Sequence, residues 1–183
     1  IKPYDDPKEG DIIDSNSGMF AGMVMEQGCR PKIYDIVPDI YEQIKETVTK
    51  AVEENDLVVV NAGSSAGTED YTVSVLAELG EVVVHGVAMK PGKPVILAIV
   101  KGKPVIGLPG YPVSAYLAFD TFVTPVINKM LKSATKSKNI VKAVLAKRLI
   151  SSLKHREYVR VRVGHVGGRL VASPLARGAG VAM

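Results

Sequence analysis

The sequence has no tryptophan, a single cysteine and no long apolar run, and each absence removes a class of protein. Cys29 has no second cysteine for an intrachain disulfide, and no CxxC motif or histidine lies near it at metal-site spacing. No stretch approaches the roughly 20 apolar residues of a membrane-spanning helix. The N-terminal run Pro3-Tyr4-Asp5-Asp6-Pro7 is also unlike a signal peptide. We therefore expect a cytoplasmic protein that neither crosses nor enters a membrane.

Aromatic residues make up only 5% of the chain, and charge is segregated along it. Residues 1–56 hold 13 acids against 6 bases, although the whole chain carries a net charge of +4. Lysine and arginine recur over residues 129–162. A solvated linker with exposed strand faces explains this basic stretch better than a nucleic-acid groove, because side chains that could stack on bases are nearly absent. We expect no nucleic-acid partner.

In the first two thirds of the chain, apolar patterns typical of strands alternate with apolar patterns typical of helices, which predicts an α/β layered domain. The sheet is expected to be mostly parallel, with one antiparallel hairpin around the turn Lys101-Gly102. Helices are expected over residues 17–27, 39–54, 70–79 and 112–130, and strands over residues 32–37, 57–60, 81–85, 95–100 and 103–108.

The character of the chain changes after residue 132. Residues 133–138 form a polar connector without periodicity. Beyond it, residues 141–150, 158–166 and 170–173 read as strands, with no helical pattern between them. We therefore expect an α/β domain over residues 1–132 and a small β domain over residues 133–183. The second domain is expected to be truncated, because the chain stops within a glycine-rich turn.

Four polar loops follow predicted strands or precede predicted helices, which is where open α/β sheets bind ligands. The first loop, Asp14-Ser15-Asn16-Ser17, could cap a helix or hold a metal ion and hydroxyl groups. The second loop, residues 61–70, carries glycines and serines that suit an anion. It is not a Walker loop, because no lysine follows Gly67. Asp70 could cap its helix, or sit beside a bound anion if Mg²⁺ bridges the two.

The third loop, residues 89–94, places Lys90 and Lys93 among two prolines and a glycine. Lysines on a fixed backbone suit a polyanionic ligand, although an exposed turn with solvated lysines would have the same sequence. The fourth loop, residues 108–115, places Pro112 near the start of a helix, with Ser114 in its first turn. It could bind an anion or serve only as a helix cap.

The order of these motifs identifies a family. The run from Gly80 through residues 85–94, followed by residues 107–110 and 112–115, resembles the molybdopterin molybdenumtransferase family, to which gephyrin belongs. The first loop is similar to that family's first loop, and Gly63, Ser65 and Gly67 match its GGxSxG loop. The resemblance is strong over about residues 10–130 and weak over the β tail.

The resemblance implies a three-layer αβα molybdopterin-binding domain, followed by a small β domain. It also implies Mg²⁺-dependent insertion of molybdate into adenylylated molybdopterin with release of AMP, carried out by a homodimer. By that likeness Asp70, Lys90 and Lys93 are expected to be catalytic, and Asp14 and Asp70 to bind the metal. The residues expected to contact the pterin nucleotide are Asn16, Gly63, Ser64, Ser65, Gly67, Pro109, Gly110, Pro112 and Ser114.

The chain also departs from the family pattern. Ala62 stands in place of the family's first loop glycine, and Tyr111 replaces the asparagine of its usual PGNP motif. The family's first central strand, with an active-site acid, and its N-terminal domains have no counterpart. We therefore expect a fragment with little turnover of its own. The alternative is a non-catalytic dimerisation or scaffold module of the gephyrin type.

Overall fold

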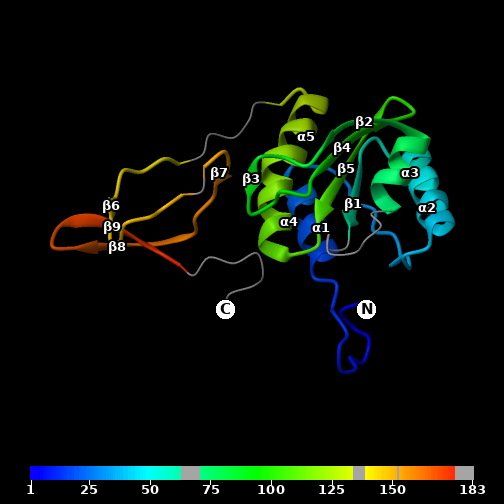
Figure 1. The fold of residues 1–183 in the computed structure, drawn as a ribbon. Coiled ribbons are helices and arrows are strands. Elements are labelled where there is room, and N and C mark those ends of the chain that lie inside the picture. Colours follow the sequence, from blue (N-terminus) through cyan, green and yellow to red (C-terminus); the bar gives the residue numbers. More distant parts are fainter. Residues whose placement is uncertain (63–70, 134–138, 152, 176–183) are drawn as a thin grey trace.

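A four-stranded sheet forms the centre of the first part of the chain. The computed structural model describes residues 1–62, 71–133, 139–151 and 153–175. The strands are β1 (Val58–Ala62), β5 (Lys103–Pro109), β4 (Ile96–Val100) and β2 (Gly80–His85), adjacent in that order (Figure 1).

Strand direction in this sheet is mixed. β1 and β5 are parallel, whereas β4 pairs antiparallel with both β5 and β2. Three of the four strands therefore share one direction, but only one of the three pairings is parallel, which corrects the expectation of a mostly parallel sheet. The reversal occurs at Lys101-Gly102, where both residues have positive φ, of 50° and 74°. Such angles are those of a tight hairpin turn.

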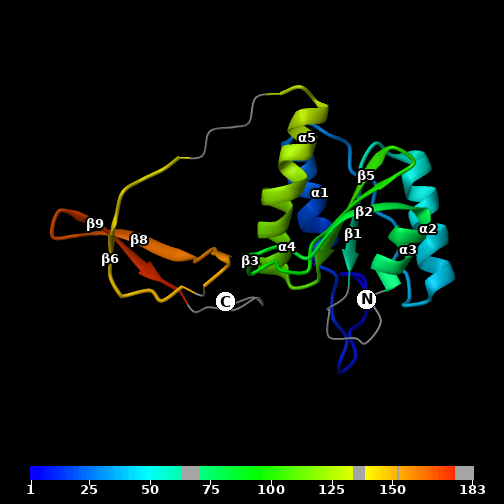
Figure 2. The ribbon, with the colours of Figure 1, turned by 45° about the horizontal axis from the view of Figure 1, so that its top comes forward.

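Helices cover both faces of the sheet (Figures 1 and 2). α2 (Tyr41–Glu54) and α3 (Tyr71–Leu79) pack on one face, where Val52, Val75 and Leu76 are completely buried. α1 (Asn16–Glu26), α4 (Pro112–Ala118) and α5 (Thr124–Met130) cover the other face through a second buried cluster. The three-layer αβα arrangement is confirmed.

The helix expected over residues 112–130 is continuous but not uniform. Between α4 and α5 lies a π-helical turn, η1 (Phe119–Val123), in which the Thr124 backbone N–H bonds to the Phe119 carbonyl five residues back. Pro125 follows immediately, and its ring would clash with a carbonyl four residues earlier in a regular α-helix. A widened turn relieves that clash.

The strand predicted over residues 32–37 is wrong. These residues are irregular and join none of the described sheets. Their side chains bind α2 instead: Glu54 accepts hydrogen bonds from Lys32 at 2.7 Å and from Tyr34 at 2.5 Å. β-branched composition alone does not make a strand, because a strand needs a neighbour for its backbone groups.

The second part of the chain is a small β unit. β6 (Val144–Leu145), β9 (Arg169–Pro174) and β8 (Val161–Val166) form one sheet in that order. The strand predicted over residues 141–150 shrinks to β6, and nearly all of residues 141–150 are exposed, so no buried face favours a longer strand. The prediction of a truncated end lies outside the described residues, and the domain division at residue 132 stays a prediction.

A two-stranded ladder joins this unit to the α/β layers. β3 (Met89–Lys90) pairs in parallel with β7 (Arg156–Glu157). The Arg156 N–H bonds to the Ala88 carbonyl, and the Tyr158 N–H bonds to the Lys90 carbonyl, both at 2.8 Å. The sequence did not predict this ladder, since two residues are too few to show a period. No helix among the described residues has the length and apolar character needed to span a bilayer.

Candidate functional site

The first, third and fourth predicted loops, and the described start of the second, lie at one end of the central sheet. β1 and β5 are parallel and in register, with Ala62 opposite Pro109, so the second and fourth loops leave the sheet side by side. β4 runs the other way, with Ile96 opposite Gly107, so the third loop enters the sheet at the same end. We call this the loop end.

Asn16 brings the first loop into this group. It is the first residue of α1 and only 4% exposed. Its side-chain N–H₂ donates to the Gly110 carbonyl at 2.7 Å and to Asn61 Oδ1 at 3.2 Å. One side chain therefore ties the first loop to the start of the second and to the fourth.

Asp14 stabilises the first turn of α1. Its carboxylate accepts hydrogen bonds from the Ser17 backbone N–H at 3.1 Å and from the Ser17 hydroxyl. Asp14 thus supports the start of the helix, one of the two interpretations left open for the first loop, although the N-cap residue Ser15 forms no side-chain cap bond itself. Carboxylate oxygens have further lone pairs, so these bonds leave room for a cation.

The third loop has a well-defined base and exposed lysines. Backbone bonds from Gly86 N to the Val95 carbonyl and from Val87 N to the Lys93 carbonyl close it at 2.8 and 2.9 Å. The Lys90–Pro91 peptide is cis. Lys90 and Lys93 are both exposed, and neither side chain forms an ion pair or hydrogen bond with a described residue.

The third loop packs closely against the fourth. A Cβ added at Gly92 would lie 2.3 Å from Met89 Cε, 3.7 Å from the Ser114 carbonyl oxygen and 3.9 Å from Ala118 Cβ. Ser114 itself is 3% exposed, and its hydroxyl has no partner among the described residues. The third loop and α4, which carries Ser114, thus pack against each other.

This arrangement fits an anion that also carries hydrogen-bonding groups. Two unpaired ammonium groups and an unpaired hydroxyl can contact phosphate or oxoanion oxygens. Asn16 Oδ1 is a buried acceptor without a partner among the described residues, and such orphans are rare in native proteins. The loop end is therefore rich in polar groups that the described part of the protein leaves unsatisfied.

The donor set for a metal ion is small. The described residues hold no group of three or more histidine, cysteine, aspartate or glutamate side chains that could bind a metal. Mg²⁺ commonly keeps several waters and takes only one or two protein carboxylates plus substrate phosphates. Asp14 fits that role for a magnesium ion that arrives with a nucleotide.

Part of the predicted site lies outside the described residues: Gly63, Ser64, Ser65, Gly67 and Asp70. Pro109, Gly110 and Pro112 are at the loop end, where the sequence places them. Sequence reasoning missed Asn61 as a site residue. The sequence feature that could have indicated Asn61 is that it is the first polar residue after the three valines of β1.

The resolved pKa shifts belong to another part of the molecule. Hydrogen bonds from Lys32 and then Tyr34 lower the pKa of Glu54, and those from Lys45 and then Tyr41 lower the pKa of Glu78. These groups join α2 to its neighbours.

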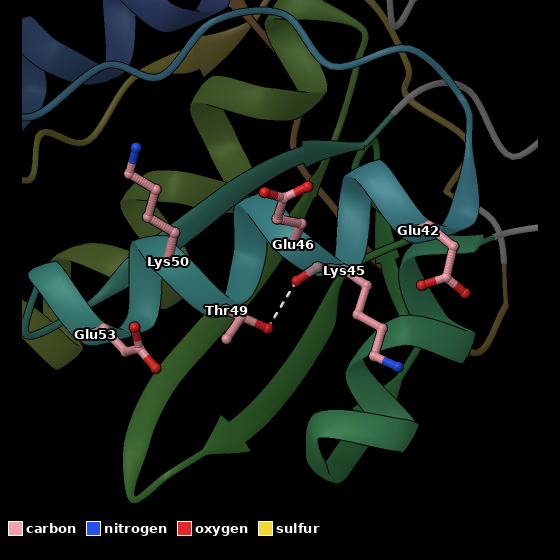
Figure 3. A pocket seen from close by; sticks show the side chains of 6 residues that line it. All are labelled: Glu42, Lys45, Glu46, Thr49, Lys50 and Glu53. Carbon is pink, nitrogen blue, oxygen red and sulfur yellow. Dashed lines mark hydrogen bonds between the residues drawn. The ribbon is translucent and has the colours of Figure 1, made fainter.

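A hollow of about 430 Å³ lies on the outer face of α2 (Figure 3). All of its lining residues come from that one helix: Glu42, Lys45, Glu46, Thr49, Lys50 and Glu53. Acids and lysines spaced three and four residues apart are typical of a solvated helix face. The hollow is no candidate for the site.

Comparison with known proteins shows the family of this chain. The family model described as a probable molybdopterin binding domain matches residues 5–129. A Methanocaldococcus jannaschii protein named for molybdopterin biosynthesis is 39% identical over 155 residues, covering 85% of this chain and 37% of that protein. The molybdopterin molybdenumtransferase of Bacillus subtilis is 30% identical over 172 residues, covering 93% and 40%.

A solved structure is also similar. The molybdopterin biosynthesis protein from Pyrococcus horikoshii has a TM-score of 0.81 and 35% identity, covering 98% of this chain and 43% of that one. The chain thus spans about two fifths of the length of these relatives.

Proposed function

This chain belongs to the molybdopterin-binding domain family, and from that premise we propose that it is the ligand-binding part of an enzyme of molybdenum cofactor biosynthesis. The reaction is the Mg²⁺-dependent insertion of molybdate into adenylylated molybdopterin, with release of AMP. The observation that carries the proposal is that the first, third and fourth loops lie with the start of the second at one sheet end, where Lys90 and Lys93 have no partner among the described residues.

The lysines supply charge for the reaction. Pterin pyrophosphate, molybdate and AMP are all anionic, and fixed cations stabilise negative charge that develops as a phosphate bond breaks. Lys90 and Lys93 are therefore proposed as catalytic groups together with Asp70. Asp14 and Asp70 are proposed to hold the magnesium ion, whose chemistry is to neutralise phosphate oxygens.

The remaining predicted residues, Asn16 apart, bind the pterin nucleotide in this proposal. The Ser114 hydroxyl and the backbone around Pro109, Gly110 and Pro112 face the ligand from the fourth loop. Asn16 supports them from below the surface. Gly63, Ser64, Ser65 and Gly67 supply backbone and hydroxyl donors from the second loop.

Binding of AMP and of molybdate in the presence of MgCl₂ tests this proposal by calorimetric titration. Lys90→Gln and Lys93→Gln should each weaken binding about tenfold, since each removes a charge-assisted contact. Lys101→Gln is the matched control, because Lys101 is already paired with Glu53 at 2.7 Å on another surface. Equal affinity in all four proteins would contradict the proposed anion site.

Turnover is a separate part of the proposal. The chain alone should release little AMP, whereas a polypeptide of the relatives' length that contains this sequence should release it in a molybdate-dependent way. Asp70→Asn in that longer protein should abolish release. Unchanged release would remove Asp70 from the catalytic group.

A non-catalytic scaffold that dimerises is the second candidate. The observation that favours it is the small β unit, where Val161, Val163 and Val166 are 39%, 45% and 66% exposed. Exposed apolar strands suit a contact with another chain. Sedimentation that shows a homodimer, together with no detectable nucleotide or molybdate binding, would support the scaffold over the enzyme.

A further inference from the structure

We propose that Asn16 is a positioning residue, whose buried amide holds the Gly110–Tyr111 peptide so that the Tyr111 N–H faces the ligand. The inference deepens the proposed function, since it rests on anion binding at the loop end. It assigns Asn16 an action through Gly110 and not a contact with the ligand.

Burial and sequence separation both point to a locking role. Asn16 is 4% exposed and its Oδ1 is itself buried, whereas the Ser114 hydroxyl is not among the buried unpaired atoms, so the Asn16 amide is the less accessible of the two to a ligand. Its two acceptors are distant in sequence, 45 residues away at Asn61 and 94 residues away at Gly110. Among the described residues these are the only side-chain hydrogen bonds that join the first, second and fourth loops.

The Gly110 carbonyl fixes how the amide is turned. A backbone carbonyl can only accept, so the atom of Asn16 at 2.7 Å from it must be the nitrogen. A flipped Asn16 amide would set Oδ1 against that carbonyl oxygen and lose the bond, whereas the Asn61 amide could turn to suit either orientation. In the orientation observed, Oδ1 has no partner among the described residues. The unpaired Oδ1 contributes no bond that could orient the side chain, and a buried unpaired acceptor costs stability. The bonds of the Asn16 nitrogen therefore hold the amide in place.

Because the peptide bond is planar, holding the Gly110 carbonyl also fixes the direction of the Tyr111 N–H. In a trans peptide the carbonyl and the following N–H point in opposite directions. The only cis bond among the described residues is Lys90–Pro91. With the Gly110 carbonyl held toward Asn16 at 2.7 Å, the Tyr111 N–H therefore points away from Asn16.

That N–H is an available donor. It has no hydrogen-bond partner among the described residues, and Tyr111 is 55% exposed. Gly110, which has no side chain, would let the peptide rotate if the carbonyl were released. The Asn16 bond removes that freedom before the ligand arrives, which lowers the entropy lost on binding.

The test measures the direction of the Tyr111 N–H and the affinity for AMP with MgCl₂ in the same proteins. Residual dipolar couplings report the N–H direction without any ligand. The variants are Asn16→Ala and Asn16→Asp. Asn55→Ala is the matched control, because the Asn55 side-chain nitrogen also donates to a carbonyl, at 2.8 Å, and to a side-chain oxygen, at 2.9 Å, but at the C-terminal end of α2.

We expect Asn16→Ala to reorient the Tyr111 N–H and to weaken AMP binding about tenfold, the equivalent of one lost hydrogen bond. Asn55→Ala should change neither. Asn16→Asp adds a pH profile: when protonated, the new acid can donate to the Gly110 carbonyl, so both readouts should return toward normal at acidic pH. A role in stability alone would produce no such recovery of the N–H direction.

An unchanged Tyr111 N–H in Asn16→Ala overturns the inference, whatever the affinity. Weaker binding with an unchanged N–H would show that Asn16 touches the ligand itself. If the N–H turns but the native chain binds no AMP, the positioning role holds and the proposed function fails. If Asn16→Ala does not fold, Asn16→Asp at acidic and neutral pH decides between the same outcomes.

Discussion

At Gly92 the backbone adopts a φ of +111°, and the nearest side-chain atom belongs to Met89, which is 4% exposed. Gly92→Ala should destabilise the protein by about 1–3 kcal/mol, because alanine disfavours this φ and its Cβ would displace Met89 Cε. Urea unfolding measures the change. AMP affinity should also fall, because the third loop, which carries Lys90 and Lys93, must shift against α4.

Gly102→Ala provides the comparison for this prediction. Gly102 also has a positive φ, of +74°, but nothing lies within 4 Å of its would-be Cβ. Its substitution should therefore show only the backbone cost, about 1 kcal/mol, and leave AMP affinity unchanged. A Gly92→Ala protein no less stable than Gly102→Ala would mean that the close approach to Met89 is easily relieved.

The loops of the site could be predicted from the sequence, but the contacts between them could not. Polar loops after β1 and β5 were predictable, because apolar runs end at Asn61 and Pro109. The hydrogen bond between Asn16 and Gly110 could not be predicted, because 94 residues separate them and no local sequence pattern indicates a contact at that distance along the chain.

Among the elements, local patterns succeeded where packing and pairing agree with them. The helices on both faces and the strands β4 and β5 were predicted closely, because each has a buried stripe. The strand predicted over residues 32–37 was wrong, since Lys32 and Tyr34 bind Glu54 of α2. The β-branched Ile33 and Ile36 stay exposed, and no described strand lies beside them. The π-helical turn was missed because Pro125 shifts hydrogen bonds without changing the apolar period.

The contact between α2 and α3 makes stability depend on pH. Glu78 accepts hydrogen bonds from Lys45 at 2.6 Å and Tyr41 at 2.5 Å, which lower its pKa from 4.5. A lowered pKa adds stability above about pH 4.5, and that contribution disappears as the pH falls through the folded-state pKa. Glu78→Gln should therefore be less stable than the native chain at neutral pH, with the difference narrowing in acid.

Urea unfolding of both proteins at several pH values between neutral and acidic conditions measures that difference. Added salt should also narrow it at neutral pH, because this pair is exposed and screened. A gap that stays constant across the whole pH range would show that Glu78 acts through packing and not through its charge.

Across the whole molecule, burial is concentrated in the α/β layers. Among the described residues from 139 onward, only Ala172 is buried. Local opening should therefore be easier in the small β unit. Hydrogen exchange of the amides in β8 and β9 should be at least roughly a hundredfold faster than in β4 and β5. Mass spectrometry of exchanged peptides checks this.

The exchange experiment contains its own reference. The Arg156 and Tyr158 amides donate to the Ala88 and Lys90 carbonyls across the two parts, so these two amides should exchange at the rate of the less stable part, the β unit. Protection in β8 and β9 equal to that in β4 and β5 would mean that the two parts open together, and it would count against separate domains.

β1 is the outermost strand of the four-stranded sheet among the described residues, and it consists largely of valine. A strand in that position offers its free backbone groups to any extended chain it meets. This has a practical consequence for handling the protein. Concentrated solutions should form oligomers that grow with time and protein concentration, and short peptides with the β1 sequence should cap them.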